Sequence, residues 1–164
     1  MICIEDPLRE EAVEVIRELR KAGLSKIVMM TGDSERTAKA IAKRVGVDEY
    51  YAEVLPEDKA EFCEREKAAG RKVIMIGDGI NDSPALSAAN VGIAISDGAE
   101  IAREIADITV GADNLKELVT LKKISNGLIK RISHNYHSIV GFNAGLIRTW
   151  CSRYHHADNI RITS

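Results

Sequence analysis

The chain has 164 residues, 45% of them hydrophobic and 29% charged, which is the composition of a soluble globular protein with one buried core. The net charge of −2 gives no support to a nucleic-acid partner. Three scattered cysteines without a CxxC pair indicate reduced thiols in a cytosolic compartment. We expect no signal peptide, and no run reaches the roughly 18–20 apolar residues of a membrane span.

Short apolar runs alternate with helical patterns as far as residue 113. Two helical patterns begin with a proline and end at a glycine, as helices commonly do, at Pro7 and Gly23 and at Pro56 and Gly70. Continuous apolar strands between helices predict an α/β fold, a Rossmann-like parallel sheet with helices on both faces. The predicted helices cover 7–23, 33–45, 56–70, 83–89, 99–106 and 114–131, and the predicted strands cover 26–30, 50–53, 72–77, 91–95 and 108–110.

Polar loops follow two of the predicted strands. The first loop is Thr31-Gly32-Asp33, and the second runs from Gly77 to Asp82 with the sequence GDGIND. Lys59 lies in the first turn of the helix that follows the strand at 50–53. Because ligands of open parallel sheets bind beyond the carboxyl ends of the strands, we expect these residues to share one rim of the sheet.

The residue types on this rim suit a magnesium–phosphate site. The Thr31 hydroxyl and free loop N–H groups can hold phosphate oxygens, and Lys59 supplies a positive charge to the same phosphate. Asp78 and Asp82, with Asn81 beside them, offer the oxygen ligands that Mg²⁺ prefers. Each feature alone has a structural explanation: TGD as a turn with an N-cap, a helix-start lysine as solvated surface, GDGIND as a tight turn.

In this order and spacing, the motifs resemble one family. TGD, PEDK, GDGINDSPAL and VGIAI are similar to the second half of the phosphorylation domain of P-type ATPases, in the haloacid-dehalogenase-like superfamily. The resemblance covers about residues 1–147, and Ser83 stands where alanine is commoner. The basic helix followed by NYHSIVGFNAGLI looks most like the heavy-metal-transporting subgroup, in which it would lead into a membrane helix.

The resemblance implies a role for each matching residue. Thr31 and Gly32 of the TGD loop that ends at Asp33 would contact an aspartyl phosphate, and Lys59 would neutralise charge on the transferring phosphoryl group. Asn81 would hydrogen-bond on the phosphate side. The implied cofactor is Mg²⁺, with Asp78 as a direct ligand and Asp82 orienting the metal's waters or the loop. Asp6 would assist nucleotide contact and domain coupling.

The family's nucleophilic Asp-Lys-Thr-Gly-Thr motif does not occur in the sequence. Without that aspartate, transfer through an aspartyl phosphate cannot run, so we expect the isolated chain to be inactive or nearly so. The strand that would carry it is central in the family's sheet. Its absence would leave an exposed seam that invites a homodimer or a complementing chain.

The predicted organisation has three parts: a phosphorylation-domain half over 1–113, a helix leading into a truncated membrane segment over 114–147, and a divergent tail over 148–164. The favoured function is part of a pump in which ATP hydrolysis drives heavy-metal export at the cytoplasmic face of the cell membrane, the chain as given being soluble. The alternatives are a haloacid-dehalogenase-like phosphatase and a split regulatory or complementing module. Soft-metal binding by Cys151 and the histidines of the tail is less expected than solvation.

Overall fold

The computed structural model describes residues 10–78, 81–95, 104–111 and 114–160, with side chains described as far as Ser152. Asp6, Gly79 and most of the helix predicted over 99–106 lie outside these residues. The chain forms two compact units, residues 1–122 and 123–164, each of which is described by itself.

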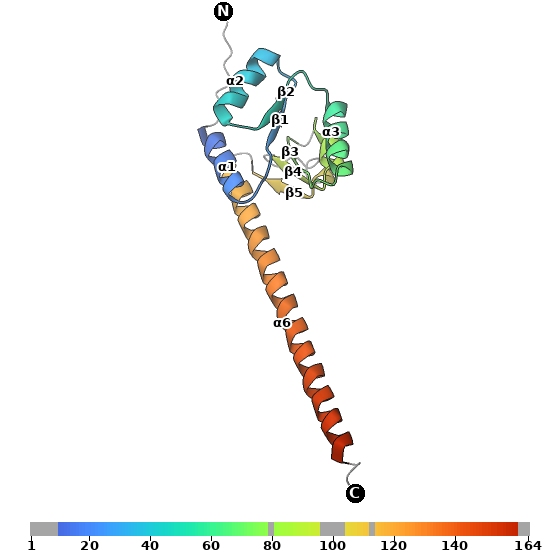
Figure 1. Cartoon of the computed structure of the whole chain (residues 1–164). Coiled ribbons are helices and arrows are strands. Elements are labelled where there is room, and N and C mark those ends of the chain that lie inside the picture. The colour runs from blue at the N-terminus through green and yellow to red at the C-terminus, as the bar shows by residue number, and fades with distance from the viewer. Residues whose placement is uncertain (1–9, 79–80, 96–103, 112–113, 161–164) are drawn as a thin grey trace, which may run out of the picture. The chain divides into compact units, whose positions relative to one another are not determined.

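The first unit confirms the predicted alternation of helices and strands (Figure 1). Short loops join consecutive elements from α1 to β3, as is usual in α/β proteins. The described elements before the long C-terminal helix are α1 (Glu10–Lys21), β1 (Val28–Met30), α2 (Glu35–Val45), β2 (Glu49–Tyr51), α3 (Pro56–Ala68), β3 (Ile74–Gly77), α4 (Ser83–Ala88), β4 (Val91–Ile95) and β5 (Ile108–Val110).

All pairings among the described strands are parallel, as predicted, but the strands form two sheets and not one. β1 pairs with β2, placing Met29 opposite Tyr50. β3, β4 and β5 form the second sheet, in which Ile93 lies opposite Ile76 on one side and Ile108 on the other. Among the described strands, β1 and β3 are therefore edge strands, each paired along one side.

Local sequence signals explain where several elements end. α2 is preceded by Ser34 in an extended conformation and followed by Gly46, whose φ of 80° is left-handed. The Gly46 N–H donates to the Ala42 carbonyl at 2.9 Å, satisfying a group that the end of a helix leaves unpaired. β2 begins shortly after this turn, at Glu49.

Two apolar clusters form the core of the first unit. One joins Val15 and Leu19 of α1 to Ile93 of β4 and Val110 of β5. The other joins Cys63 of α3 to Met75 of β3, with α4 and β4 contributing the remaining members. The members of the second cluster are Cys63, Met75, Ala85, Leu86 and Ala94. α1 therefore packs on one side of the second sheet, and α3 and α4 pack on the other.

α6 (Lys116–Ile160) begins in the first unit and continues through the second. The sequence predicts a helix that ends near Arg131, and the structure corrects this: one uninterrupted helix extends to Ile160. The helix does not stop at Lys130 and Arg131, because straight-chain residues such as lysine and arginine are good helix formers. No helix of the described residues is long and apolar enough to span a membrane.

Candidate functional site

The PEDK sequence forms the start of α3, with Pro56 as its first residue. The Asp58 carboxylate turns back and accepts a hydrogen bond from the Leu55 N–H at 3.1 Å. Proline at the first position and a carboxylate cap in the first turn both favour a helix start at this point. The helix start fixes the backbone from which Lys59 extends.

Lys59 and Asp82 form an ion pair that spans from α3 to the start of α4. The Nζ of Lys59 lies 2.6 Å from Oδ1 of Asp82, and the two side chains are only 14% and 13% exposed. The Asp82 carbonyl also accepts from the Leu86 N–H at 2.9 Å, as the residue before a helix does. The pair therefore holds a positive and a negative group at the carboxyl end of β3.

Gly77 allows the Asp82 side chain to approach β3. A Cβ atom at position 77 would lie 2.6 Å from Cβ of Asp82 and still closer to its Oδ2. Side-chain atoms essentially never meet at such distances, so any larger residue would displace the carboxylate. The glycine of IMIG is explained by this close approach.

Asp78 and Asn81 come together in the loop after β3. The Asn81 N–H donates to Oδ1 of Asp78 at 3.2 Å, and both residues are exposed. An exposed carboxylate beside a partly buried one, both at the end of a parallel strand, offers oxygen ligands to a hard cation. Asp78 and Asp82 are the two acidic side chains that the described part of this loop provides.

The TGD loop forms a compact turn after β1. The Thr31 hydroxyl donates to Oδ2 of Asp33 at 2.9 Å and accepts from the Asp33 N–H at 3.1 Å. The Asp33 carbonyl accepts from the N–H of Glu53, which has a left-handed φ of 55°. A Cβ at Gly32 would meet only the Val54 carbonyl, at 3.8 Å, so the backbone of this loop is open to a ligand.

A cavity of about 620 Å³ lies between the facing edges of the two sheets. Val28 and Met30 of β1 and Ile74 and Ile76 of β3 are among its lining residues. Ile74 and Ile76 remain 41% and 36% exposed, an unusual state for isoleucines of a parallel sheet. This cavity separates the strands that the sequence predicted in one sheet.

Lys59 and Asp82 are also among the residues that line this cavity. The cavity therefore connects apolar strand edges to the predicted phosphate rim. The TGD loop follows the lining strand β1, and the GDGIND loop follows the lining strand β3. Cys63 lines the same cavity, and burial raises the pKa of its thiol.

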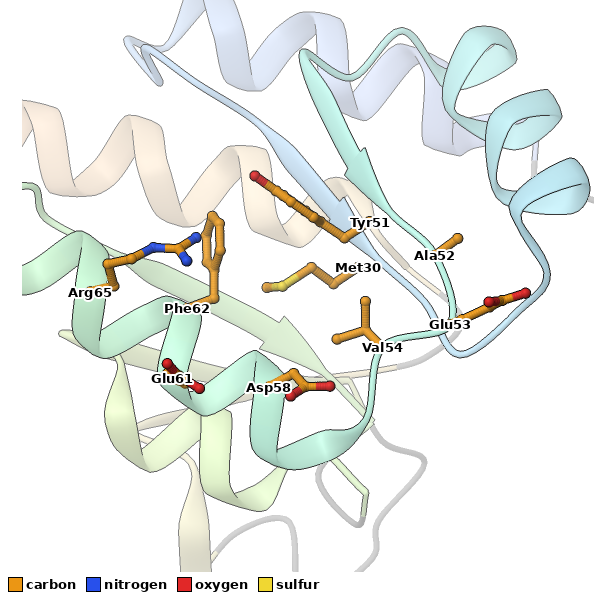
Figure 2. Close-up of a pocket in the computed structure, with 9 residues that line it drawn as sticks. All are labelled: Met30, Tyr51, Ala52, Glu53, Val54, Asp58, Glu61, Phe62 and Arg65. Atoms are coloured by element: carbon orange, nitrogen blue, oxygen red, sulfur yellow. The ribbon is translucent and has the colours of Figure 1, made fainter.

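A second, smaller cavity of about 280 Å³ lies against β2 and α3 (Figure 2). Tyr51 and Phe62 contact each other there at 5.3 Å between ring centroids, and the Arg65 guanidinium lies 5.1 Å from the Phe62 ring. The Tyr51–Phe62 contact packs β2 against α3, and the Arg65–Phe62 contact lies within α3. Met30 lines both cavities.

Seven of the eight candidate site residues are described, and they meet in three groups: Lys59 with Asp82, Asp78 with Asn81, and the Thr31-Gly32-Asp33 turn. The eighth, Asp6, lies outside the described residues. Sequence reasoning missed Asp58, whose cap orients the first turn of α3, although aspartate two residues after Pro56 is a recognisable capping signal.

A family model, haloacid dehalogenase-like hydrolase, matches residues 1–90. The chain belongs to this family. A probable copper-importing P-type ATPase A of Enterococcus hirae is 44% identical over 82% of this chain and 19% of its own length. A manganese-exporting P-type ATPase of Mycobacterium leprae is 41% identical over 88% of this chain and 20% of its own length. The chain thus spans about a fifth of these relatives, which are heavy-metal P-type ATPases.

Solved structures show the same likeness. A zinc-transporting PIB-type ATPase matches with a TM-score of 0.72 and 38% identity, over 81% of this chain and 22% of that one. The catalytic domain of a CPx-ATPase matches with a TM-score of 0.63 and 35% identity, over 73% of this chain and 46% of that one. The predicted fold class and family are confirmed.

Proposed function

We propose that this chain supplies the magnesium- and phosphate-binding half of the phosphorylation domain of a heavy-metal P-type ATPase. The observation that carries the proposal is the Lys59–Asp82 ion pair, 2.6 Å long, at the end of a cavity between two parallel edge strands. In the complete pump the domain would lie at the cytoplasmic face of the membrane, with ATP as phosphoryl donor and a heavy-metal cation as cargo.

The TGD loop and Lys59 would bind the phosphoryl group. The accessible backbone at Gly32 would present its N–H, and the Thr31 hydroxyl, whose proton the Asp33 carboxylate accepts in this structure, would turn to the phosphate on binding. Lys59 places its positive charge on the same rim, where it would neutralise negative charge on the transferring group. Asn81 would add a side-chain amide.

The residues at the end of β3 fit a magnesium ion. Mg²⁺ in phosphate sites is commonly held by one or two carboxylates, with water and substrate oxygens completing the shell, and Asp78 and Asp82 provide two carboxylates. Bound Mg²⁺ would supply charge stabilisation to the phosphate oxygens. Asp78, which is exposed, would be the direct ligand, and the Asp82 carboxylate, already held by Lys59, would orient water. Asp6 would assist nucleotide coupling.

The cavity between β1 and β3 would receive an additional strand. Each of these strands is paired along one side among the described strands, and the cavity walls carry exposed isoleucines, so an extended apolar segment could pair on both sides. A segment with the nucleophilic aspartate at its carboxyl end would place that group beside Lys59 and Asp82. A second copy of the chain, pairing edge to edge as a homodimer, is the competing occupant.

Calorimetry tests the phosphate-binding proposal. Purified chain is titrated with fluoroaluminate, a phosphate mimic, with and without Mg²⁺, and beside an Asp78→Ala variant. We expect magnesium-dependent binding that Asp78→Ala abolishes and that the matched control Glu64→Ala, an exposed acidic residue of α3 outside the site, leaves unchanged. Binding that is equal in Asp78→Ala and in the original chain would contradict the proposed role of the GDGIND loop.

Two other functions make different predictions. A standalone phosphatase of the same family would hydrolyse p-nitrophenyl phosphate with Mg²⁺, and we expect no turnover because the sequence contains no Asp-x-Asp loop to supply the nucleophile. A purely regulatory module would bind its partner chain without acquiring phosphate from ATP, whereas phosphorylation restored on mixing with the missing half would favour a split complementing module. Incubation of the mixed chains with ATP therefore distinguishes the regulatory module from a chain that completes the phosphorylation site.

A further inference from the structure

One row of side chains on α3 faces α4. Lys59, Cys63 and Lys67 follow each other at a spacing of four residues, and residues at this spacing lie on the same side of a helix. Lys59 pairs with Asp82, the residue that directly precedes α4. Cys63, which is 1% exposed, belongs to the same buried cluster as Leu86 of α4. Lys67 lies one further turn along this row.

Lys67 binds the opposite end of α4 from Asp82. Its Nζ donates to the carbonyl oxygen of Ala88, the last residue of α4, at 2.5 Å, and lies 3.5 Å from the carbonyl oxygen of Ala89. The last carbonyls of a helix have no donor within the helix, and a basic side chain nearby can satisfy them. The sequence of α4, SPALSA, contains no basic residue. The neighbouring helix α3 therefore supplies this donor through Lys67.

The two lysines hold α4 at both of its ends. Lys59 and Lys67 are separated by about 12 Å of helix rise, and Asp82 and Ala88 by about 9 Å, so the two helices run in the same direction. α4 has only six residues, and so short a helix depends on tertiary contacts for its stability. Loss of the contact at Ala88 would let α4 fray or shift along α3, and Asp82 would move with it.

We propose that Lys67 is a positioning residue for the Asp82 carboxylate and, through it, for the phosphate site. By binding the Ala88 carbonyl, Lys67 fixes α4 along α3 and keeps Asp82 at its short distance from Lys59. Lys67 acts only through α4, because its Nζ contacts the end of the helix that lies away from Asp82. Its effect on phosphate binding rests on the function proposed above, whereas its coupling to Asp82 does not.

A double-mutant cycle in the full chain tests the coupling between Lys67 and Asp82. Urea denaturation is measured for the original chain, for Lys67→Met, which removes the donor and keeps the side-chain length, for Asp82→Asn and for the double variant. We expect Lys67→Met to raise the unfolding equilibrium constant about fivefold in the original chain and less than about twofold beside Asp82→Asn. An equal factor in both backgrounds, including no effect in either, would overturn the proposal.

Magnesium-dependent binding of fluoroaluminate gives a readout that a purely structural lysine would not change in the folded protein. The titrations use a temperature at which circular dichroism shows every variant to be folded. We expect Lys67→Met to weaken binding at least about fivefold and Lys67→Arg to keep it within about twofold, since arginine still donates to the Ala88 carbonyl. Lys39→Met, which removes an exposed positive charge from α2, is the matched control and should bind as the original chain does.

The outcomes separate this role of Lys67 from the function on which its effect rests. Equal fluoroaluminate affinity in Lys67→Met and in the original chain would overturn the positioning role and leave the phosphate site in place. Lys67→Arg binding as weakly as Lys67→Met would also overturn it, because the contact with Ala88 requires only a donor. An original chain that does not bind fluoroaluminate would contradict the proposed function, and the double-mutant cycle then decides the coupling to Asp82.

Discussion

The Nζ of Lys59 lies 2.6 Å from Oδ1 of Asp82, joining the first turn of α3 to the residue that precedes α4. The two groups come from positions 23 residues apart in the chain. Their side chains are largely shielded from water, so each charge depends on the other for its stabilisation. The same two side chains line the cavity between the edge strands β1 and β3. The ion pair that stabilises the fold therefore also belongs to the proposed phosphate site.

Replacing Lys59 by methionine should destabilise the first unit. The variant keeps the length of the side chain but leaves the carboxylate of Asp82, a residue only 9% exposed, without its cation. We expect a loss of about 1–3 kcal/mol in the free energy of unfolding, measured by urea denaturation. Lys39→Ala, on the exposed side of α2, should change it by less than about 0.5 kcal/mol.

A double-mutant cycle separates the pair from its surroundings. Lys59→Met and Asp82→Asn together should cost less than the sum of the two single changes, because the double variant leaves no unpaired charge. Strict additivity of the two changes would contradict the ion pair as a source of stability.

Gly77→Ala should destabilise the chain by about 1–3 kcal/mol, since the added methyl group would overlap the Asp82 side chain. The penalty should shrink in an Asp82→Gly background, in which that side chain is absent. Chemical denaturation of the four proteins checks this. An unchanged penalty in the Asp82→Gly background would mean that the cost has another origin.

Stability should fall in acid through Asp48. Its carboxylate accepts hydrogen bonds from the Arg20 guanidinium at 2.8 Å and from the Ile27 N–H at 2.7 Å, and these partners hold its pKa below the ordinary 3.8. The folded state therefore binds this proton less readily than the unfolded state. The resulting stabilisation is present above pH 3.8 and is lost as the pH falls through the lower folded value.

The measurement for Asp48 is thermal unfolding across this pH range, with Asp48→Asn as the comparison. The original chain should lose more stability than the variant as the pH falls below 3.8. Parallel pH profiles for the two proteins would show that Asp48 does not contribute.

The cysteines should differ in reactivity. Cys63 is 1% exposed and burial raises the pKa of its thiol, whereas Cys151 is exposed on α6. In a Cys3→Ser background, a thiol reagent such as Ellman's should modify Cys151 at once and Cys63 only slowly, because the reactive thiolate is scarce and shielded. Rapid modification of two thiols per chain in the absence of denaturant would contradict the described packing of α3.

Much of the fold could be predicted because its signals are local. Proline and glycine mark the ends of α3, Gly46 ends α2, and the apolar run of β4 identifies a buried strand. The resemblance implied a seam where a central strand is missing, but the cavity between β1 and β3 and the residues that line it depend on how these strands lie in space. The length of α6 was also missed, because the basic residues Lys130 and Arg131 resemble the last turn of a helix although the helix continues past them.

The candidate site was predictable in composition but not in contacts. The spacing of TGD, PEDK and GDGIND indicated which residues belong to the rim. Only the structure shows that Lys59 pairs with Asp82 and that Gly77 makes room for this carboxylate, whereas the Asp58 cap follows a local signal present in the sequence. The Lys59–Asp82 pair joins residues distant in sequence, and the Gly77 contact depends on backbone direction, which a motif does not encode.

The most direct test of the account is phosphorylation in trans. The chain is mixed with a polypeptide that carries the Asp-Lys-Thr-Gly-Thr segment and nucleotide-binding domain of a heavy-metal P-type ATPase, and radiolabelled ATP and Mg²⁺ are added. We predict an acid-stable, hydroxylamine-sensitive phosphoprotein that forms only in the mixture and is reduced at least about tenfold by Lys59→Met. A stable complex of the two polypeptides that takes up no phosphate, or one equally phosphorylated with Lys59→Met, would contradict the account.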